Sequence, residues 1–260
     1  MKLTQLFTVL TAGALALVSV SAIAAPQPMD ATQKAQIESV VHDYLMKNPQ
    51  VIVDAVNSMQ KEQYEKMQEK TQQSALVNVS NLFHLGTDPV VGNPKGKITI
   101  VEFFDYQCPH CVDMAPVIDG IIKSNPDVRI VLKDFPIRGP MSVTAAKASL
   151  AANMQGKYWE FYQVVMKNAA GLTEDKLYGY AKGVGLNVDK LKADMNSPAV
   201  DAQIKGTYKL AQDLQLMGTP ALFIAKTDLP KDANVNAIAF VPGQIDQKNL
   251  QGMLDKTAHS

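Results

Sequence analysis

Two cysteines constrain this chain more than any other feature. Cys108 and Cys111 are its only cysteines, and they lie one helical turn apart, just after an apolar run that ends at Phe104. A disulfide between them would close a loop of two intervening residues, and so short a loop removes little entropy from the unfolded chain. Stabilisation of the fold by a structural disulfide therefore explains the pair poorly. Reversible redox chemistry or metal binding is left.

The charge balance excludes several classes of partner. The 260 residues include 25 basic and 25 acidic side chains, and 47% of the residues are hydrophobic. The sequence has no cluster of basic residues of the kind that nucleic-acid binding needs. Its apolar content is too high for extensive disorder. We therefore expect a folded domain of ordinary size plus an extension, which acts on proteins or small molecules and binds no nucleic acid.

The first residues have the three parts of a secretory signal peptide. Lys2 supplies the positive charge, residues 6–20 form the apolar segment, and Ala22 and Ala24 form a small-residue cleavage site. We expect residues 1–24 to be removed by cleavage near Ala24, and the mature protein to work in an oxidising compartment. An uncleaved membrane anchor is the alternative, but the run is short for a span of about 20 residues.

Residues 25–85 predict a helical oligomerisation region. Only Asn48-Pro49 interrupts the pattern, which indicates a helix, a break and a second helix from Pro49 to about Leu85. The apolar side chains of the first helix share one face: Ile37, Val40, Val41, Tyr44 and Leu45. The long second helix cannot bury its own stripe on so short a partner, so it packs on another copy of the chain or on the domain that follows. We expect a homodimer, with a trimer as the alternative.

The rest of the chain predicts an α/β domain that begins after a turn-rich linker over residues 86–96. Strand, helix and strand in quick succession make a βαβ unit with parallel strands, and two later strand-like runs close together predict an antiparallel hairpin. The expected elements are strand 98–104, helix 109–123, strand 128–132, helices from 141 to 216, strands 221–224 and 237–241, and helix 246–256.

Two groups of large side chains in this domain are expected to pack in its core. One is the aromatic cluster Tyr158, Trp159, Phe161 and Tyr162. The other is the set of methionines Met141, Met154 and Met217, for which a soft peptide-binding surface is the alternative.

The position of Cys108 favours a reactive thiol. It stands at the N-terminal end of the helix, where unpaired backbone N–H groups and the helix dipole stabilise a thiolate. A protonated His110 would lower the pKa of this thiol further, and Pro109 suits the first turn. Cys111, one turn into the helix, is expected to be the more buried thiol that attacks Cys108 to resolve mixed disulfides.

The motif Cys108-Pro109-His110-Cys111 resembles that of the thioredoxin superfamily, and within it the DsbA-like thiol oxidoreductases of the bacterial periplasm. The resemblance covers residues 97–260 and implies a thioredoxin fold, with residues 97–139 and 217–260 as its core and a helical insertion over residues 140–216. The whole DsbA-like domain would span residues 86–260. The N-terminal extension resembles the oligomerising arms of the Com1-like and ScsC-like branches.

The same resemblance implies roles for single residues. Glu102 matches a buried acid that helps to move the proton of the second cysteine. Thr219 and Pro220 match a cis-proline dipeptide that aligns the substrate backbone beside the reactive disulfide. For Glu102 the alternative is a strand-end carboxylate, with Lys133 as a candidate partner across the parallel strands.

The predicted function is that of a periplasmic thiol-disulfide oxidoreductase that introduces disulfides into secreted proteins and isomerises them. The oxidised form would hold a Cys108–Cys111 disulfide, and no bound cofactor or metal is needed. A DsbB-like membrane partner would reoxidise an oxidase, whereas a DsbD-like partner would keep an isomerase reduced. The alternatives are a non-catalytic copper-binding or surface protein on a thioredoxin scaffold, and a zinc site completed by histidines.

Overall fold

A computed structural model of the chain describes residues 29–84, 86–230 and 233–259. The predicted signal peptide, residues 1–24, lies outside this described part. Across the described ranges, no helix is long and apolar enough to cross a membrane. The chain divides into two compact units, of which the first ends at Met59 and the second begins at Gln60. This boundary falls inside a helix, earlier than the division at residue 85 that the sequence suggests.

The first unit is helical. Helix α1, Ala31–Lys47, begins with a capping box, because the Asp30 carboxylate accepts from the backbone N–H groups of Thr32 and Gln33 and the Gln33 side chain accepts from the Asp30 N–H. Asn48 ends α1, and α2, Gln50–Val77, follows. This confirms the predicted helix, break and helix. No residue of α1 is buried.

The predicted second helix is interrupted near its end. Helix α2 ends at Val77, and α3, Val79–Phe83, is a separate short helix. Asn78 lies between them, and its side chain donates to the Ser74 carbonyl at 2.9 Å. The end of α2 is part of the second unit, where Ala75 packs in one apolar cluster with Leu82 and Phe83 of α3.

The second unit is built on one mixed sheet in the order β1-β3-β2-β4-β5. Its strands are β1 Val90–Gly92, β2 Ile98–Phe104, β3 Val128–Asp134, β4 Ala221–Lys226 and β5 Ile238–Pro242. Among the strands of the described ranges, only β2 and β3 pair in parallel, and α4, Pro109–Ser124, joins them, which confirms the βαβ unit. The hairpin β4–β5 is antiparallel, as predicted. Strand β1 was not expected, since its residues read as linker.

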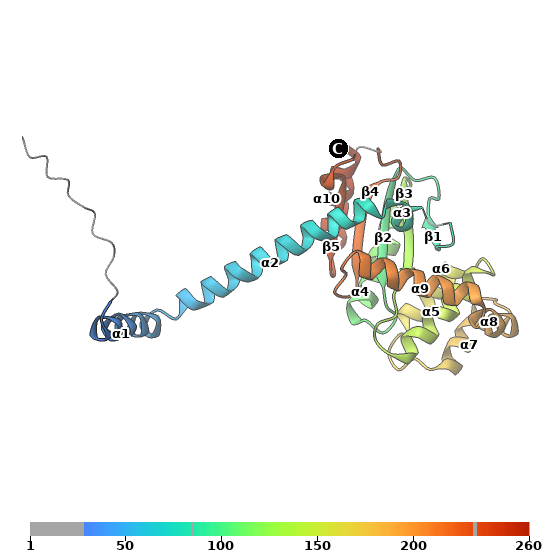
Figure 1. The fold of residues 1–260 in the computed structure, drawn as a ribbon. Coiled ribbons are helices and arrows are strands. Elements are labelled where there is room, and N and C mark those ends of the chain that lie inside the picture. Colours follow the sequence, from blue (N-terminus) through green and yellow to red (C-terminus); the bar gives the residue numbers. More distant parts are fainter. Residues whose placement is uncertain (1–28, 85, 231–232, 260) are drawn as a thin grey trace, which may run out of the picture. The chain divides into compact units, whose positions relative to one another are not determined.

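Helices cover both faces of this sheet (Figure 1). They are α5 Pro140–Asn153, α6 Tyr158–Lys167, α7 Glu174–Gly183, α8 Val188–Met195, α9 Pro198–Asp213 and α10 Gln247–His259. One apolar cluster packs α4, α5, α6, α7, α8 and α10 against one face of the sheet. A second cluster packs α2, α3 and the end of α9 against the opposite face. All seven residues of β2 are buried, as its continuous apolar run predicts.

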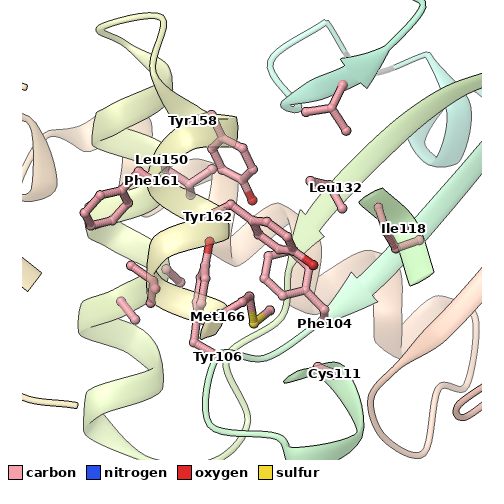
Figure 2. Close-up of a cluster of buried hydrophobic side chains, with 14 of the residues drawn as sticks. Phe104, Tyr106, Cys111, Ile118, Leu132, Leu150, Tyr158, Phe161, Tyr162 and Met166 are labelled. Carbon is pink, nitrogen blue, oxygen red and sulfur yellow. The ribbon is translucent and has the colours of Figure 1, made fainter. Parts of the chain in front are cut away.

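The aromatic cluster is core, as predicted. Tyr158, Phe161 and Tyr162 are buried, and Trp159 is partly buried and packs against the same cluster. The Tyr162 ring meets Phe104 edge to face (Figure 2). The prediction for the methionines is wrong at two positions. Met141 packs against the core, but Met154 is 50% and Met217 84% exposed. Met154 lies at the end of α5 and Met217 in the loop before β4, and no described helix or strand covers either side chain.

Candidate active site

The two cysteines lie where β2 passes into α4. Cys108 is the N-cap of α4 and Pro109 its first residue, so the Cys108 side chain lies at the end of the helix where the first backbone N–H groups have no partner within the helix. The Cys111 N–H donates to the Cys108 carbonyl at 3.0 Å. Both cysteines are buried free thiols, so the structure represents the reduced form of the pair, and the Cys108–Cys111 disulfide stays a prediction for the oxidised form.

Asp105 holds the loop that carries Cys108. Its carboxylate is buried and accepts four hydrogen bonds, from the backbone N–H groups of Gln107, Ile137 and Arg138 and from the Ser142 hydroxyl. The Asp105 carbonyl also accepts from the Cys108 N–H at 3.1 Å. One side chain therefore ties the cysteine loop to the start of α5. Sequence reasoning missed Asp105, because three of these partners lie more than thirty residues further along the chain.

The Thr219–Pro220 dipeptide lies against Cys108. Its peptide bond is cis, and the Cys108 thiol donates to the Thr219 carbonyl at 3.2 Å. The antiparallel pairing of β4 with β2 places this dipeptide at the carboxyl end of β2, next to the cysteine loop. The structure thus brings together Cys108, Cys111, Thr219 and Pro220.

The pKa values of the two thiols move in opposite directions. Burial raises the pKa of Cys108, but hydrogen bonds at Thr219, at Cys111 and at the His110 backbone outweigh it and leave the pKa below its ordinary value. The Thr219 hydroxyl is buried and has no hydrogen-bond partner within the described ranges, so it is free to donate to a thiolate. Burial, and then the charge of Glu102, raise the pKa of Cys111.

Glu102 lies in the middle of β2, and its side chain is completely buried. Neither of its carboxyl oxygens has a hydrogen-bond partner among the residues that the structure describes. Burial, and then the charge of Cys108, raise the pKa of Glu102 to about 8, so the carboxyl is mostly protonated at neutral pH. It is a buried acid on the face of the sheet that α4 covers.

Lys133 is not the partner of Glu102, which corrects that expectation. In the parallel register Glu102 is opposite Leu132, so Lys133 points to the other face of the sheet. There its ammonium forms a buried ion pair with Asp88 and donates to the Asn81 carbonyl at 2.8 Å. This pair fixes the segment between α3 and β1 and plays no part in the cysteine site.

His110 is exposed on the first turn of α4, where its Nδ1 lies 3.1 Å from the Gln244 Oε1. An amide oxygen only accepts, so this contact holds the proton on Nδ1. Gln244 comes from the turn before α10, 134 residues away, and nothing in the sequence signals it.

Three buried tyrosines, Tyr106, Tyr158 and Tyr162, belong to the same apolar cluster as Cys111 (Figure 2). The Tyr158 hydroxyl donates to the Asp134 carboxylate at 2.8 Å, whereas the hydroxyls of Tyr106 and Tyr162 have no hydrogen-bond partner in the described structure. Burial raises the pKa of each of these three tyrosines well above its usual value. Glu102 and Cys111 therefore lie among buried, neutral tyrosine hydroxyls, where a charge is costly.

The described ranges hold no group of three or more His, Cys, Asp or Glu side chains arranged to bind a metal ion. The arrangement of the two cysteines and Glu102 can support thiol chemistry. It has one thiol with a lowered pKa at a helix N-terminus, a second with a raised pKa one turn away, and a neutral acid in the strand that leads to them.

Two family profiles match this chain. The profile of the DSBA-like thioredoxin domain matches residues 99–255, which is more than half of the chain. The profile of the copper resistance protein ScsC N-terminal domain matches residues 33–66, which run from α1 through the break between the helices to Lys66 of α2.

Solved structures show the same fold. BcfH of Salmonella enterica Typhimurium is 31% identical with a TM-score of 0.71, over 87% of this chain and 96% of that one. A thioredoxin-like oxidoreductase of Silicibacter pomeroyi DSS-3 is 37% identical with a TM-score of 0.60. The match covers 70% of this chain and 98% of that one.

Curated relatives match over a smaller part of their length. The Na(+)/H(+) antiporter NhaA 1 of Salinispora arenicola is 27% identical over 145 residues, which are 53% of this chain and 21% of the antiporter. The chain thus spans about a fifth of the curated relatives it matches.

Proposed function

Because the chain belongs to the DSBA-like thioredoxin domain family, we propose that it is a protein thiol-disulfide oxidoreductase that exchanges disulfides with cysteine-containing proteins through Cys108 and Cys111. The observation that carries this proposal is the contrast between the two thiols. The pKa of Cys108 is lowered and that of Cys111 is raised, although they lie one helical turn apart. Such a pair suits one attacking sulfur and one resolving sulfur.

The proposed reaction begins with the Cys108–Cys111 disulfide. A substrate thiolate attacks the Cys108 sulfur, a substrate–Cys108 disulfide forms, and the Cys108–Cys111 bond breaks with its electron pair on Cys111. With its raised pKa, the Cys111 thiolate takes up a proton, and the buried, neutral Glu102 carboxyl, which interacts electrostatically with Cys111, can supply or relay it.

A second substrate thiolate then attacks the substrate sulfur of the mixed disulfide. A disulfide forms in the substrate, and Cys108 leaves as a thiolate. Its lowered pKa makes it a good leaving group, and the Thr219 hydroxyl and the N–H groups of α4 stabilise the charge. The substrate is oxidised by two electrons, and the cysteine pair is reduced by two.

The remaining site residues have supporting roles in this proposal. His110 adds positive charge beside Cys108 when it is protonated, and Gln244 orients its ring. Pro109 opens α4 without an unpaired N–H group. The cis Thr219–Pro220 dipeptide aligns the substrate backbone next to Cys108.

We further propose that the protein works in the periplasm after cleavage near Ala24, as a homodimer or trimer. Support for assembly comes from the ScsC N-terminal profile over residues 33–66 and from the exposed apolar side chains of α1. More than one site in an assembly would favour isomerisation beside oxidation. A DsbB-like membrane protein would then reoxidise Cys108 and Cys111, or a DsbD-like one would reduce them.

The thiolate pKa and the redox potential test the central proposal. We expect the thiolate absorbance of the reduced protein to titrate well below the usual cysteine pKa of about 8.5, and to vanish in Cys108→Ala but not in Cys111→Ala. The couple should lie above the thioredoxin value of about −270 mV. A Cys108 with an ordinary pKa and a couple more reducing than thioredoxin would overturn the oxidant assignment.

Copper binding by the dithiol is the second candidate, because one profile carries the name of a copper resistance protein. Thiolates are soft ligands that favour Cu(I). Titration of the reduced protein with Cu(I) against a competing chelator tests this candidate. Equal affinities for the wild type and Cys111→Ala would rule out a dithiol site.

A further inference from the structure

A cavity beside the cysteine site has one wall that comes from the long N-terminal helix. It has a volume of about 250 Å³ and extends from Thr219 and Pro220 past Met217 and Phe240 to Met67 and Thr71 of α2. This volume is below the range of about 300–1,000 Å³ that is typical of small-molecule pockets. The cavity can therefore take one or two side chains of a polypeptide and is small for a cofactor.

The wall from α2 is held firmly against the sheet. Thr71 is buried, and one residue later the Gln72 side chain donates to the Ile238 carbonyl of β5 at 3.0 Å. Met67 lies one turn before Thr71 and is half-buried at the edge of the cavity. On the loop side, Met217 is 84% exposed although it is a large apolar residue.

We propose that this cavity, with Met67 and Met217 at its mouth, binds the apolar side chains that flank the reacting cysteine of a substrate polypeptide. The inference rests on the proposed function. A substrate in a mixed disulfide is tied to the Cys108 sulfur, which lies 3.2 Å from the carbonyl of Thr219 in the cavity wall. Since an extended chain advances about 3.3 Å per residue, the residues next to the substrate cysteine reach the cavity.

The methionine side chains suit this task. They are unbranched and polarizable, so they adapt to apolar side chains of different shapes and favour a range of substrates over a single one. In this proposal α2 has a second role beside assembly, because its end forms part of the surface that selects substrates.

A pair of rate measurements on the full-length protein tests the proposal. The variants are Met67→Gln and Met217→Gln, which keep the length of the side chain but remove apolar surface. Glutamine also keeps the helix propensity at position 67 in α2. Met154→Gln is the matched control, since Met154 is also exposed but does not line the cavity. Each protein is assayed with a reduced peptide whose cysteine is flanked by leucines, and with dithiothreitol.

We expect the kcat/KM ratio of peptide to dithiothreitol to fall roughly three- to tenfold in each cavity variant and to stay unchanged in Met154→Gln. An unchanged ratio in both cavity variants would overturn the proposal. A change in oligomeric state, measured by light scattering, together with an unchanged ratio would assign the cavity to contacts between copies. A wild type that reacts with neither thiol would overturn the proposed function, and this inference with it.

A cross-link gives an independent result. Cys111→Ser is treated with a peptide that carries a benzophenone residue next to a cysteine activated as its pyridyl disulfide. The Cys108 thiolate displaces pyridine-2-thione, so a stable Cys108–peptide disulfide forms. After illumination, the proposal expects cross-links to Met67 or Met217. Cross-links confined to the surface between α4 and α6, at Val112 or Met166, would contradict it.

Discussion

Glu102 makes the stability of the reduced protein depend on pH. Its pKa is about 8 in the folded state, whereas a glutamate in an unfolded chain ionises near pH 4.3. Between these values the folded protein holds a proton that the unfolded chain has lost, so the free energy of unfolding falls by about 1.4 kcal/mol per pH unit from this residue alone. Its destabilising effect is small below pH 4 and complete above pH 8.

Glu102→Gln should remove this dependence, because a neutral amide does not ionise. We expect the reduced variant to gain stability over the reduced wild type by roughly 2–4 kcal/mol between pH 4.5 and pH 8. Urea unfolding at several pH values measures the difference. Glu160→Gln, at a half-exposed ion pair, should show little change. A stability difference that is the same at both pH values would contradict the raised pKa.

Asp105 should matter for stability as well as for the site. Asp105→Asn replaces a buried, acceptor-only carboxylate by an amide whose NH2 group faces donors, so at least one of the four donors loses its partner. We expect a loss of about 2–4 kcal/mol in the free energy of unfolding. Asp113→Asn, on the exposed side of α4, is the control. If both substitutions lower the free energy of unfolding equally in urea, the four hydrogen bonds of Asp105 do not contribute the predicted stability.

The sequence predicts the residues of the site that form a local pattern, and misses those that depend on the fold. Cys108, Pro109 and His110 follow from the strand–helix junction, and Glu102 stands out as an acid in an apolar run. Gln244 gives no local signal, because its partner lies 134 residues away. The partner of Lys133 was mispredicted for a different reason, since the alternation of side chains along β3 turns it away from Glu102.

Among the elements, those with long, regular patterns were predicted and the short ones were not. The continuous apolar run of β2 has the signature of a strand buried on both faces, whereas the three residues of β1 are too few to show a period. The break between α2 and α3 falls at Asn78, inside an apolar pattern that continues from Leu76 to Phe83, so helix periodicity does not reveal it.

Helix α1 has apolar side chains that its own unit leaves exposed. Ile37 and Val41 are about half exposed, and Val40 is 69% exposed. A helix of 17 residues is marginal alone in water, so burial of this stripe against another copy would stabilise it. Ile37→Asp should therefore shift the protein toward monomers, measured by size-exclusion chromatography with light scattering. Glu38→Gln, one residue away, should keep the wild-type mass. A monomeric wild type would contradict the assembly itself.

At the scale of the whole molecule, assembly is proposed to separate two activities of one cysteine site. Oxidation of a substrate needs a single Cys108–Cys111 disulfide. Isomerisation requires the enzyme to stay with a misfolded substrate through several exchanges, and a second site on the same particle raises the effective concentration of thiol around it. The two activities should therefore respond differently to the loss of assembly.

Ile37→Asp tests this separation, since Ile37 belongs to the first compact unit and the cysteines to the second. We expect the variant to oxidise reduced ribonuclease at the wild-type rate per site and to recover scrambled ribonuclease at least threefold more slowly, in line with the gain that linked sites provide. Cys108→Ala, inactive in both assays, sets the baseline. If the monomeric variant isomerises as fast as the wild type, assembly has no part in isomerisation. If it loses both activities equally, the arm supports the site itself, as the α2 wall of the cavity beside Thr219 would allow.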